Sequence, residues 1–233
     1  MEEFVNKIKE KGYWRILIRP NHFNNVKVQD IKDLSRLIEQ TEVRLRGWYY
    51  PHYGRENRSV GKDYIQSFCD YTSHKEFWRF YQSSQFIHYR AIREDYEFDY
   101  SKRRPLSINE PSPTNKYLEI LITLYTITEV LEFAARLANK DIYDDNIYIS
   151  ISLNDLYDRQ LFFYDDGRDL WGNYRSKENE LEFKKTFNTK DFIANHNQFA
   201  VDAAYWFFQR FNWTACPKGL LKEEQNKLIE RRL

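Results

Sequence analysis

Arginine and aromatic residues occupy every second position from 44 to 52. In this chain of 233 residues, this segment is the most informative one about possible chemistry. On an extended strand, every second side chain points to the same face. One face would then carry Arg44, Arg46, Trp48, Tyr50 and His52. Guanidinium groups between flat rings suit the phosphates and stacked bases of single-stranded nucleic acid. The same residue types anchor protein interfaces, and they also form cation–π pairs on a solvated sheet face. The segment leaves these three interpretations open.

A second aromatic segment, residues 76–90, carries large rings on both faces, which is typical of a central strand covered on both sides. The polar run at residues 82–85 interrupts this aromatic segment. It would form a hairpin turn, a bulge or the floor of a polar pocket. A buried polar run must be hydrogen-bonded, so a structural network is the default and a ligand pocket is the alternative. The candidate binding residues of this segment are Arg79, Gln82, Gln85 and Arg90.

Histidine and carboxylate side chains that suit Zn²⁺ or Mn²⁺ cluster at Asp70, His74 and Glu76, beside Cys69. No second ligand pair follows at a recognisable distance. We therefore expect no metal site and no cofactor. His196 lies on the apolar stripe of an expected helix, where a hydrogen-bonded core histidine is favoured over a ligand.

An acidic residue followed by an acidic-x-Lys run resembles the pattern of restriction-type nucleases, which bind a divalent ion with carboxylates. Asp165 or Asp166, Glu182 and Lys184 have this order. A turn followed by an ordinary amphipathic strand explains the pattern equally well. A metal-dependent nuclease is therefore an alternative function, and no catalytic set is complete.

Glycine-rich phosphate loops and the Gly-x-Ser-x-Gly nucleophile elbow are absent from the sequence, which has only seven glycines. This absence argues against ATP, GTP or dinucleotide binding by the common loops. Cys69 would need a nearby histidine to act as a nucleophile, and a small buried thiol is favoured. We expect a protein that is not an enzyme.

The formal net charge is only +1, whereas proteins that bind DNA mainly by neutralising phosphates are more basic. The balance is uneven: residues 44–93 carry nine basic and four acidic side chains, and residues 141–169 carry two basic and eight acidic ones. The basic segment and the acidic segment either form solvated loops and sheet edges or face binding partners.

Two cysteines cannot form a disulfide framework and suggest a reducing compartment.

Membrane and secretion signals are not expected in this chain. The N-terminus has no apolar signal region, and the most apolar stretch, residues 117–137, contains Glu119, Glu129 and Glu132, which would be costly in a bilayer. We expect a cytoplasmic protein without a membrane partner.

Hydrophobic periodicity predicts helices and strands without regular βα alternation, which favours an α+β fold with antiparallel sheet and packed helices. We expect helices at 2–11, 27–40, 115–139, 189–211 and from 217 onward. We expect strands at 13–20, 42–50, 62–72, 76–93, 146–153, 159–164 and 179–187, with 159–164 paired to 146–153. The helix at 115–139 is apolar around most of its circumference, so it is buried. Asn188 and Asp191 predict the start of the next helix.

The chain divides into an α+β half at residues 1–100, a proline-containing loop at 101–114, and a helix–strand–strand–helix half at 115–233. The loop holds three of the six prolines. We expect the two halves to form one domain.

Three runs of residues resemble a pattern in uncharacterised bacterial proteins. The runs are 12–15 (Gly-Tyr-Trp-Arg), 45–52 (Leu-Arg-Gly-Trp-Tyr-Tyr-Pro-His) and 78–86 (Trp-Arg-Phe-Tyr-Gln-Ser-Ser-Gln-Phe). The bacterial pattern has Asp and Gly where this chain has Tyr49 and Ser84. Such proteins are associated with Schlafen-type AlbA domains, which bind nucleic acid, and with anti-phage defence genes. The resemblance covers the first hundred residues and implies a place in a bacterial antiviral system.

Together these observations predict a non-catalytic binding module in a bacterial multi-protein system. Its Arg/Trp/Tyr face would contact a protein partner, a second copy of the chain or nucleic acid. The alternatives are the nuclease and a sensor that binds a small ligand around residues 82–85.

Overall fold

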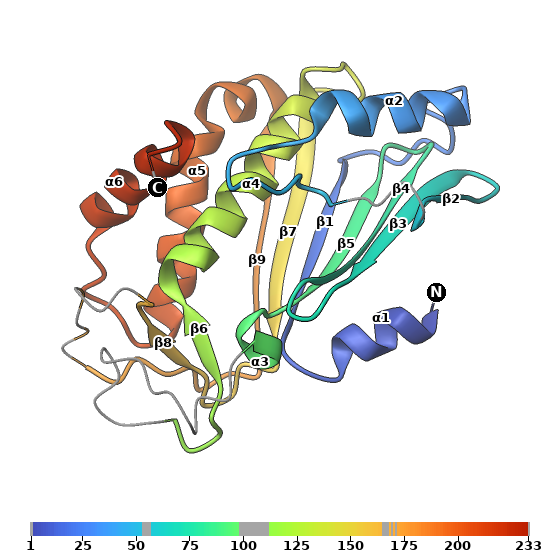
Figure 1. Ribbon diagram of the computed structural model, residues 1–233. Coiled ribbons are helices and arrows are strands. Elements are labelled where there is room, and N and C mark those ends of the chain that lie inside the picture. The colour runs from blue at the N-terminus through green and yellow to red at the C-terminus, as the bar shows by residue number, and fades with distance from the viewer. Residues whose placement is uncertain are drawn as a thin grey trace.

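Alternating apolar residues form two long neighbouring strands, residues 13–20 and 146–154, inside a seven-stranded antiparallel sheet. The computed structural model describes residues 2–52, 57–97, 112–164, 168, 170 and 172–232. The order of strands is β2–β3–β4–β5–β1–β7–β9 (Figure 1). Their bounds are Tyr13–Pro20 for β1, Ser59–Val60 for β2, Tyr64–Asp70 for β3, Lys75–Tyr81 for β4, Phe86–Ala91 for β5, Asn146–Asn154 for β7 and Glu180–Asn188 for β9.

Six helices accompany the sheet among the described residues, which confirms the predicted α+β class. They are α1 (Glu2–Lys9), α2 (Ile31–Thr41), α3 (Glu94–Glu97), α4 (Ile120–Ala138), α5 (Thr189–Arg210) and α6 (Lys218–Ile229). Strands from both halves of the sequence share the sheet, because β1 lies between β5 and β7. None of the described helices is long and apolar enough to cross a membrane.

The two faces of the sheet bury different clusters, as strand alternation requires. On the inner face, Trp14, Ile16 and Ile18 of β1 pack into a large core that includes α4 and α5. On the outer face, α1 covers β4 and β5, where Ile8 lies against Phe77. The core of the inner face draws residues from both halves of the chain.

Helix α4 is buried as predicted, but it begins at Ile120 instead of 115. The preceding residues form β6 (Tyr117–Glu119), which pairs in parallel with β8 (Gln160–Phe162). The predicted pairing of 159–164 with 146–153 is therefore wrong, since β7 already has β1 and β9 as its two neighbours. The Asn188 start of α5 is confirmed, with Asn188 Oδ1 accepting from the Asp191 N–H at 3.2 Å.

Two other predicted strands differ from the structure. Residues 76–93 form a hairpin of β4 and β5 instead of one strand, because the polar run 82–85 makes the turn and Ser84 has a φ of +63°. Residues 42–50 form a loop, described with the candidate site below. Most of the predicted proline-containing loop, 101–111, lies outside the described residues.

His196 is a hydrogen-bonded histidine between helices, as predicted. Its Nδ1 lies 2.9 Å from the Ile193 carbonyl, and its Nε2 lies 2.7 Å from Oε2 of Glu132 on α4. The hydrogen bond to His196 lowers the pKa of Glu132 to about 2. The pair fixes α5 against α4.

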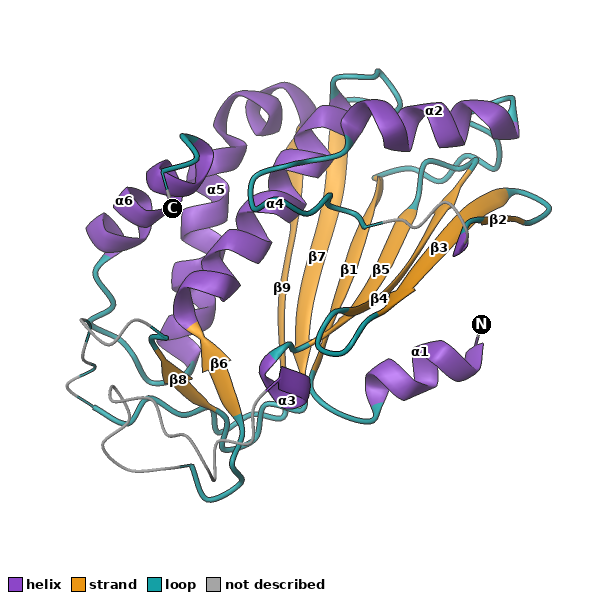
Figure 2. Cartoon of the chain, in the orientation of Figure 1, coloured by secondary structure: helices purple, strands orange, loops and turns teal. Residues whose placement is uncertain are grey.

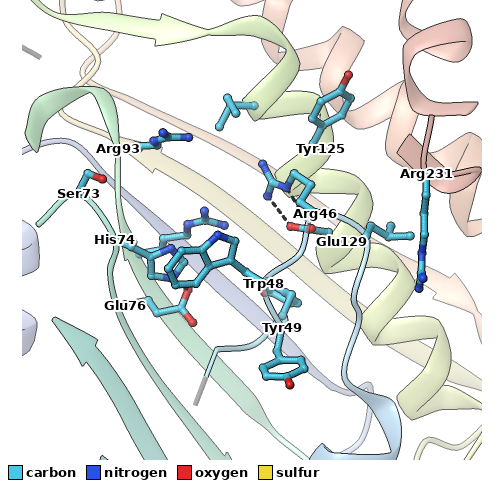
Figure 3. A pocket seen from close by; sticks show the side chains of 14 residues that line it. Arg46, Trp48, Tyr49, Ser73, His74, Glu76, Arg93, Tyr125, Glu129 and Arg231 are labelled. Carbon is cyan, nitrogen blue, oxygen red and sulfur yellow. Dashed lines mark hydrogen bonds and ion pairs between the residues drawn. The ribbon is translucent and has the colours of Figure 1, made fainter. Parts of the chain in front are cut away.

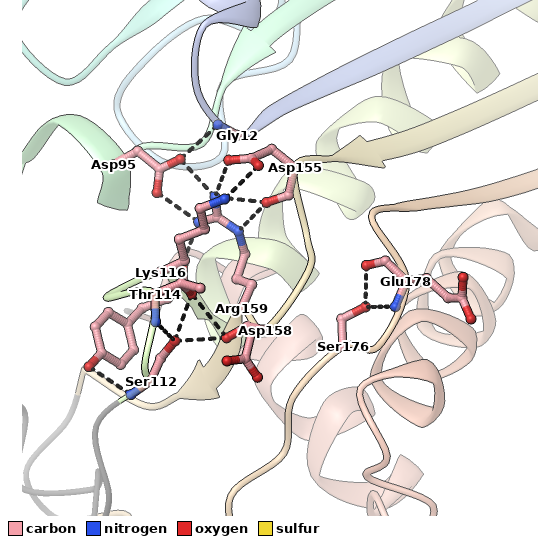
Figure 4. Close-up of polar contacts among 11 residues, drawn as sticks. Gly12, Asp95, Ser112, Thr114, Lys116, Asp155, Asp158, Arg159, Ser176 and Glu178 are labelled. Atoms are coloured by element: carbon pink, nitrogen blue, oxygen red, sulfur yellow. Dashed lines mark hydrogen bonds and ion pairs between the residues drawn. The ribbon is translucent and has the colours of Figure 1, made fainter.

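A fully buried arginine, Arg159, connects the end of the sheet where β1 begins to the β6–β8 pair. Both terminal nitrogens of Arg159 lie 2.7 Å from the Asp95 carboxylate, and Nη1 also donates to the Tyr117 carbonyl (Figure 4). Asp95 in turn accepts the Gly12 backbone N–H at 2.8 Å. A Cβ at Gly12 would meet the Arg159 guanidinium at 2.2 Å, so the close approach requires glycine here.

We predict that Arg159→Met lowers the free energy of unfolding by about 3–5 kcal/mol, because it leaves the Asp95 carboxylate buried without its cation. Urea denaturation monitored by circular dichroism measures this change. As a control, Arg36→Met breaks an exposed Arg36–Asp33 pair and has little effect. Equal stability of the two variants would contradict the structural role given to Arg159.

Candidate functional site

The segment after α2 turns back on itself instead of extending as a strand (Figure 2). Val43 and Tyr50 exchange two backbone hydrogen bonds of 2.8 Å. Between them, Gly47 has a φ of +78°, a left-handed conformation that costs glycine little. Side chains alternate between faces only along an extended backbone. The prediction that Arg44, Arg46, Trp48, Tyr50 and His52 share one face is therefore wrong.

Arg44 points away from the interior of this loop. It pairs with Glu42, and its guanidinium lies 4.1 Å from the centre of the Tyr49 ring. A solvated cation–π pair was one of the three interpretations of this segment, and the contact between Arg44 and Tyr49 is such a pair.

Arg46 points inward, onto helix α4. Its guanidinium forms a two-pronged ion pair with Glu129 and donates to the Thr126 hydroxyl at 3.2 Å. The Glu129 side chain is only 4% exposed. The pair therefore fastens the loop to the buried helix.

A cavity of about 500 Å³ lies between this loop, the β3–β4 turn, β5 and α4 (Figure 3). Arg46, Trp48 and Tyr50 of the first predicted set line it, as does Arg90 of the second set. The charged lining residues are Arg46, Arg90, Arg93, Arg231, Glu76 and Glu129. Arg46 is already paired with Glu129, so the attraction for an anion comes mainly from the half-buried Arg90 and the exposed Arg231.

Arg90 is a half-buried cation of this cavity that has no counter-ion among the described residues. Among the described residues it has no ion pair and no hydrogen bond. Burial lowers its pKa, and the nearby positive charge of Arg46 lowers it further, while Glu76 offsets part of the effect. An anion in the cavity would compensate for both unfavourable effects.

The carboxylate of Glu76 organises the wall of the cavity beside Arg90. Its Oε1 accepts the His52 backbone N–H at 2.6 Å. Its Oε2 lies 3.1 Å from Nε2 of His74 and 3.4 Å from Nε2 of His88. The Tyr50 hydroxyl lies 3.0 Å from Nδ1 of His88 and extends the network into the core.

The protonation states follow from this network. Burial disfavours the ionised carboxyl of Glu76, but the neighbouring His74 and His88 outweigh it and hold its pKa well below the usual range. Burial lowers the pKa of His88 and raises that of Tyr50. Tyr50 therefore stays a phenol at neutral pH and shares a hydrogen bond with His88.

Aromatic rings surround the mouth of the cavity. Trp48 is 50% exposed and stacks on His74, with 5.2 Å between ring centres and 13° between planes. His52 and the exposed Tyr71 lie 5.5 Å and 6.3 Å from Trp48. A half-exposed indole that is held by a second ring suits stacking of a planar group.

The remaining candidates of the second segment lie elsewhere. Arg79 is on the outer face of the sheet, where Gln66 accepts two of its N–H groups. Gln82 donates to the Val28 carbonyl and sits in the hairpin turn. The backbone carbonyl of Gln85 accepts the Tyr81 N–H and so closes the same turn. Side-chain hydrogen bonds of Gln82 and backbone hydrogen bonds hold this turn, whereas the buried Ser84 hydroxyl has no hydrogen-bond partner among the described residues.

The nuclease candidates are not brought together by the described structure. Glu182 and Lys184 lie on β9, on the outer face of the sheet, 3.0 Å apart, and the Ser150 hydroxyl donates to Glu182 at 2.7 Å. Asp165 and Asp166 lie outside the described residues.

The histidine–carboxylate cluster is only partly kept, since His74 stays beside Glu76 and Asp70 does not. Asp70 pairs with Lys7 and Lys75, away from Glu76. Cys69 is a buried thiol whose pKa burial raises to about 12, so it is a poor nucleophile. No group of three or more His, Cys, Asp or Glu side chains in the described ranges is arranged to hold a metal ion.

Several lining residues were missed by the sequence-based prediction. Arg93 and Arg231 carry no recognisable pattern. Glu129 carries a usable signal, since a carboxylate in a helix that is apolar on nearly all sides requires a buried partner. Searches against family models, curated proteins and solved structures give no match to this chain.

We predict that Glu76→Gln lowers the free energy of unfolding by about 1–3 kcal/mol at pH 7, because the His52 N–H loses a charged acceptor and the neighbouring His74 and His88 rings lose a nearby negative charge. The folded pKa of Glu76 is depressed, so its contribution is present above about pH 4.5 and is lost as pH falls through the folded pKa. The difference between the wild type and the variant should shrink below pH 4.5. Urea denaturation at several pH values tests this, and a difference that stays constant down to pH 3 would contradict it.

Proposed function

We propose that this chain is a non-catalytic binding module that holds an unpaired nucleotide of a nucleic acid in the cavity lined by Arg46, Trp48 and Arg90. The observation that carries the proposal is Arg90, a half-buried guanidinium on the cavity wall with no counter-ion among the described residues. A phosphate supplies the missing charge, and guanidinium groups bind phosphate through paired N–H donors.

The exposed face of Trp48 supports a ligand that also contains a ring. Proteins that bind single strands combine positively charged grooves with aromatic side chains on which bases stack. Trp48 and Arg90 both line the same cavity. A nucleotide offers a planar base and a phosphate in one unit, so one ligand engages both side chains.

The size and shape of the site favour an unpaired nucleotide over a duplex. The cavity of about 500 Å³ lies within the range of sites that hold small molecules and single groups. A stacked base pair does not expose the face of its bases to a tryptophan, whereas single strands do. The near-neutral net charge fits recognition at one pocket better than neutralisation of many phosphates.

The sequence resemblance points in the same direction. Arg46, Trp48 and Tyr50 belong to the run 45–52 that resembles the bacterial proteins associated with nucleic-acid-binding domains. Membership of an antiviral multi-protein system is part of this proposal, as the context in which an unpaired nucleotide would be bound.

We predict that Trp48→Ala weakens binding of a fluorescein-labelled single-stranded 15-mer of DNA or RNA by at least about fivefold, because base stacking on an aromatic side chain contributes about 1–3 kcal/mol. Arg90→Gln should weaken binding and reduce the dependence of log K on log [salt] by about 0.7, the value for one phosphate contact. Fluorescence anisotropy at several salt concentrations measures both effects.

Tyr157→Ala is the matched control, since Tyr157 is an exposed ring that does not line the cavity. Arg46 is not a suitable test position, because its removal leaves Glu129 buried without a cation. Absence of single-strand binding by the wild type at low salt, or wild-type affinity in both variants, would overturn the proposal. Loss of a captured protein in W48A and R90Q, without any nucleic-acid binding, would assign the cavity to a protein partner instead.

A further inference from the structure

Strand β9 forms one edge of the sheet, and its outer backbone is unpaired in the described structure. It pairs with β7 along its whole length, from Asn146↔Asn188 to Asn154↔Glu180, without a skipped residue. Within the described ranges, no other backbone hydrogen bond reaches residues 180–187. Alternate N–H and C=O groups of β9 therefore point outward, available to another strand.

The two edges of the sheet are built differently. At the opposite edge, β2 has only two residues, Ser59–Val60, which is one of the ways proteins avoid edge-to-edge association. β9 has nine residues and contains neither a proline nor a bulge. β9 therefore lacks the short length, the proline and the bulge that protect an edge, and only its charged side chains disfavour association with an unrelated strand.

The charges of β9 complement each other when the strand meets a copy of itself. Glu182 and Lys184 are two residues apart, so both project from the outer face. In an antiparallel pair centred on Phe183, Glu182 of each copy lies opposite Lys184 of the other. A shift of two residues in one direction places Lys184 opposite Lys184. The opposite shift places Glu182 opposite Glu182, although it also sets Lys184 opposite Glu180. The charges thus favour one register, since like charges directly opposite are destabilising.

The inner face of β9 adds an apolar contact in the same register. Phe183 is only half-buried and packs against Trp206 of α5, with ring centres 5.7 Å apart. At the centre of the antiparallel pair, the Phe183 rings of the two copies meet on the same face of the sheet. Aromatic cross-strand pairs stabilise antiparallel sheets.

We propose that β9 is a self-association edge, which pairs with β9 of a second copy around a two-fold axis at Phe183 and joins the two sheets into one. The occupant of the edge is a second copy of this chain because the complementary charges and the central ring all come from β9 itself. This is a closed two-fold contact in which each copy uses the same surface. It is independent of the nucleotide pocket, which lies on the inner face between α4 and β5.

The test is the oligomeric state of the full chain and of charge-reversed variants, measured by sedimentation velocity over a range of concentrations. The wild type should show a concentration-dependent dimer. Lys184→Glu should weaken the dimer at least tenfold, because it places like charges opposite each other twice. The double variant E182K/K184E restores opposite charges and should restore the dimer.

Lys222→Glu on α6 is the control, since it changes the net charge equally at an exposed position away from β9. Circular dichroism checks that each variant is folded. A wild type that stays monomeric at millimolar concentration would overturn the proposal. So would a K184E dimer of wild-type affinity, or a double variant that fails to recover.

Discussion

The ion pair between Arg46 and Glu129 holds the candidate site together. The two residues are 83 positions apart in the sequence, one on a loop and one on a helix that is almost completely buried. A carboxylate in that position is costly without a cation that satisfies both of its oxygens. Arg46 meets this requirement, and in doing so it sets the distance between the loop and α4. The cavity is the space that this constraint leaves open.

A second carboxylate, Glu76, plays the corresponding part on the strand side of the cavity. It holds two histidine rings and a backbone amide, and one of those rings, His74, supports the indole of Trp48. Side chains that are fixed before a ligand arrives lose little conformational entropy on binding. Arg90 differs from both carboxylates, because the described residues leave its charge to be compensated from outside. The site thus consists of satisfied pairs around Arg90, a half-buried cation that has no counter-ion among the described residues.

Local patterns in the sequence predict most of the elements but not their partners. Alternation identifies β1 and β7 because each buries one face, and Asn188 identifies the start of α5 because its side chain caps the helix. The strand expected at 42–50 fails because one glycine at positive φ reverses the chain, and residue alternation carries no information about that turn. The pairing of β8 with β6 fails because the choice of neighbour in a sheet depends on distant segments. Within the site, residue types predict Arg46, Trp48 and Arg90, and the apolar surroundings of Glu129 in the sequence indicate a buried partner, whereas Arg231 reaches the cavity only through tertiary structure.

The position of β1 has a consequence for how the chain acquires its structure. β1 is the first strand in the sequence, yet it lies between β5 and β7, and Tyr13 pairs with both Ala91 and Asn154. The middle of the sheet is therefore incomplete until a segment far along the chain has emerged and docked. Strands that are far apart in the sequence can pair only after a long loop has closed. The entropy cost of closing the loop precedes the stabilising contacts, so such pairings form slowly. During synthesis, one side of β1 stays open to solvent or to a chaperone until β7 arrives.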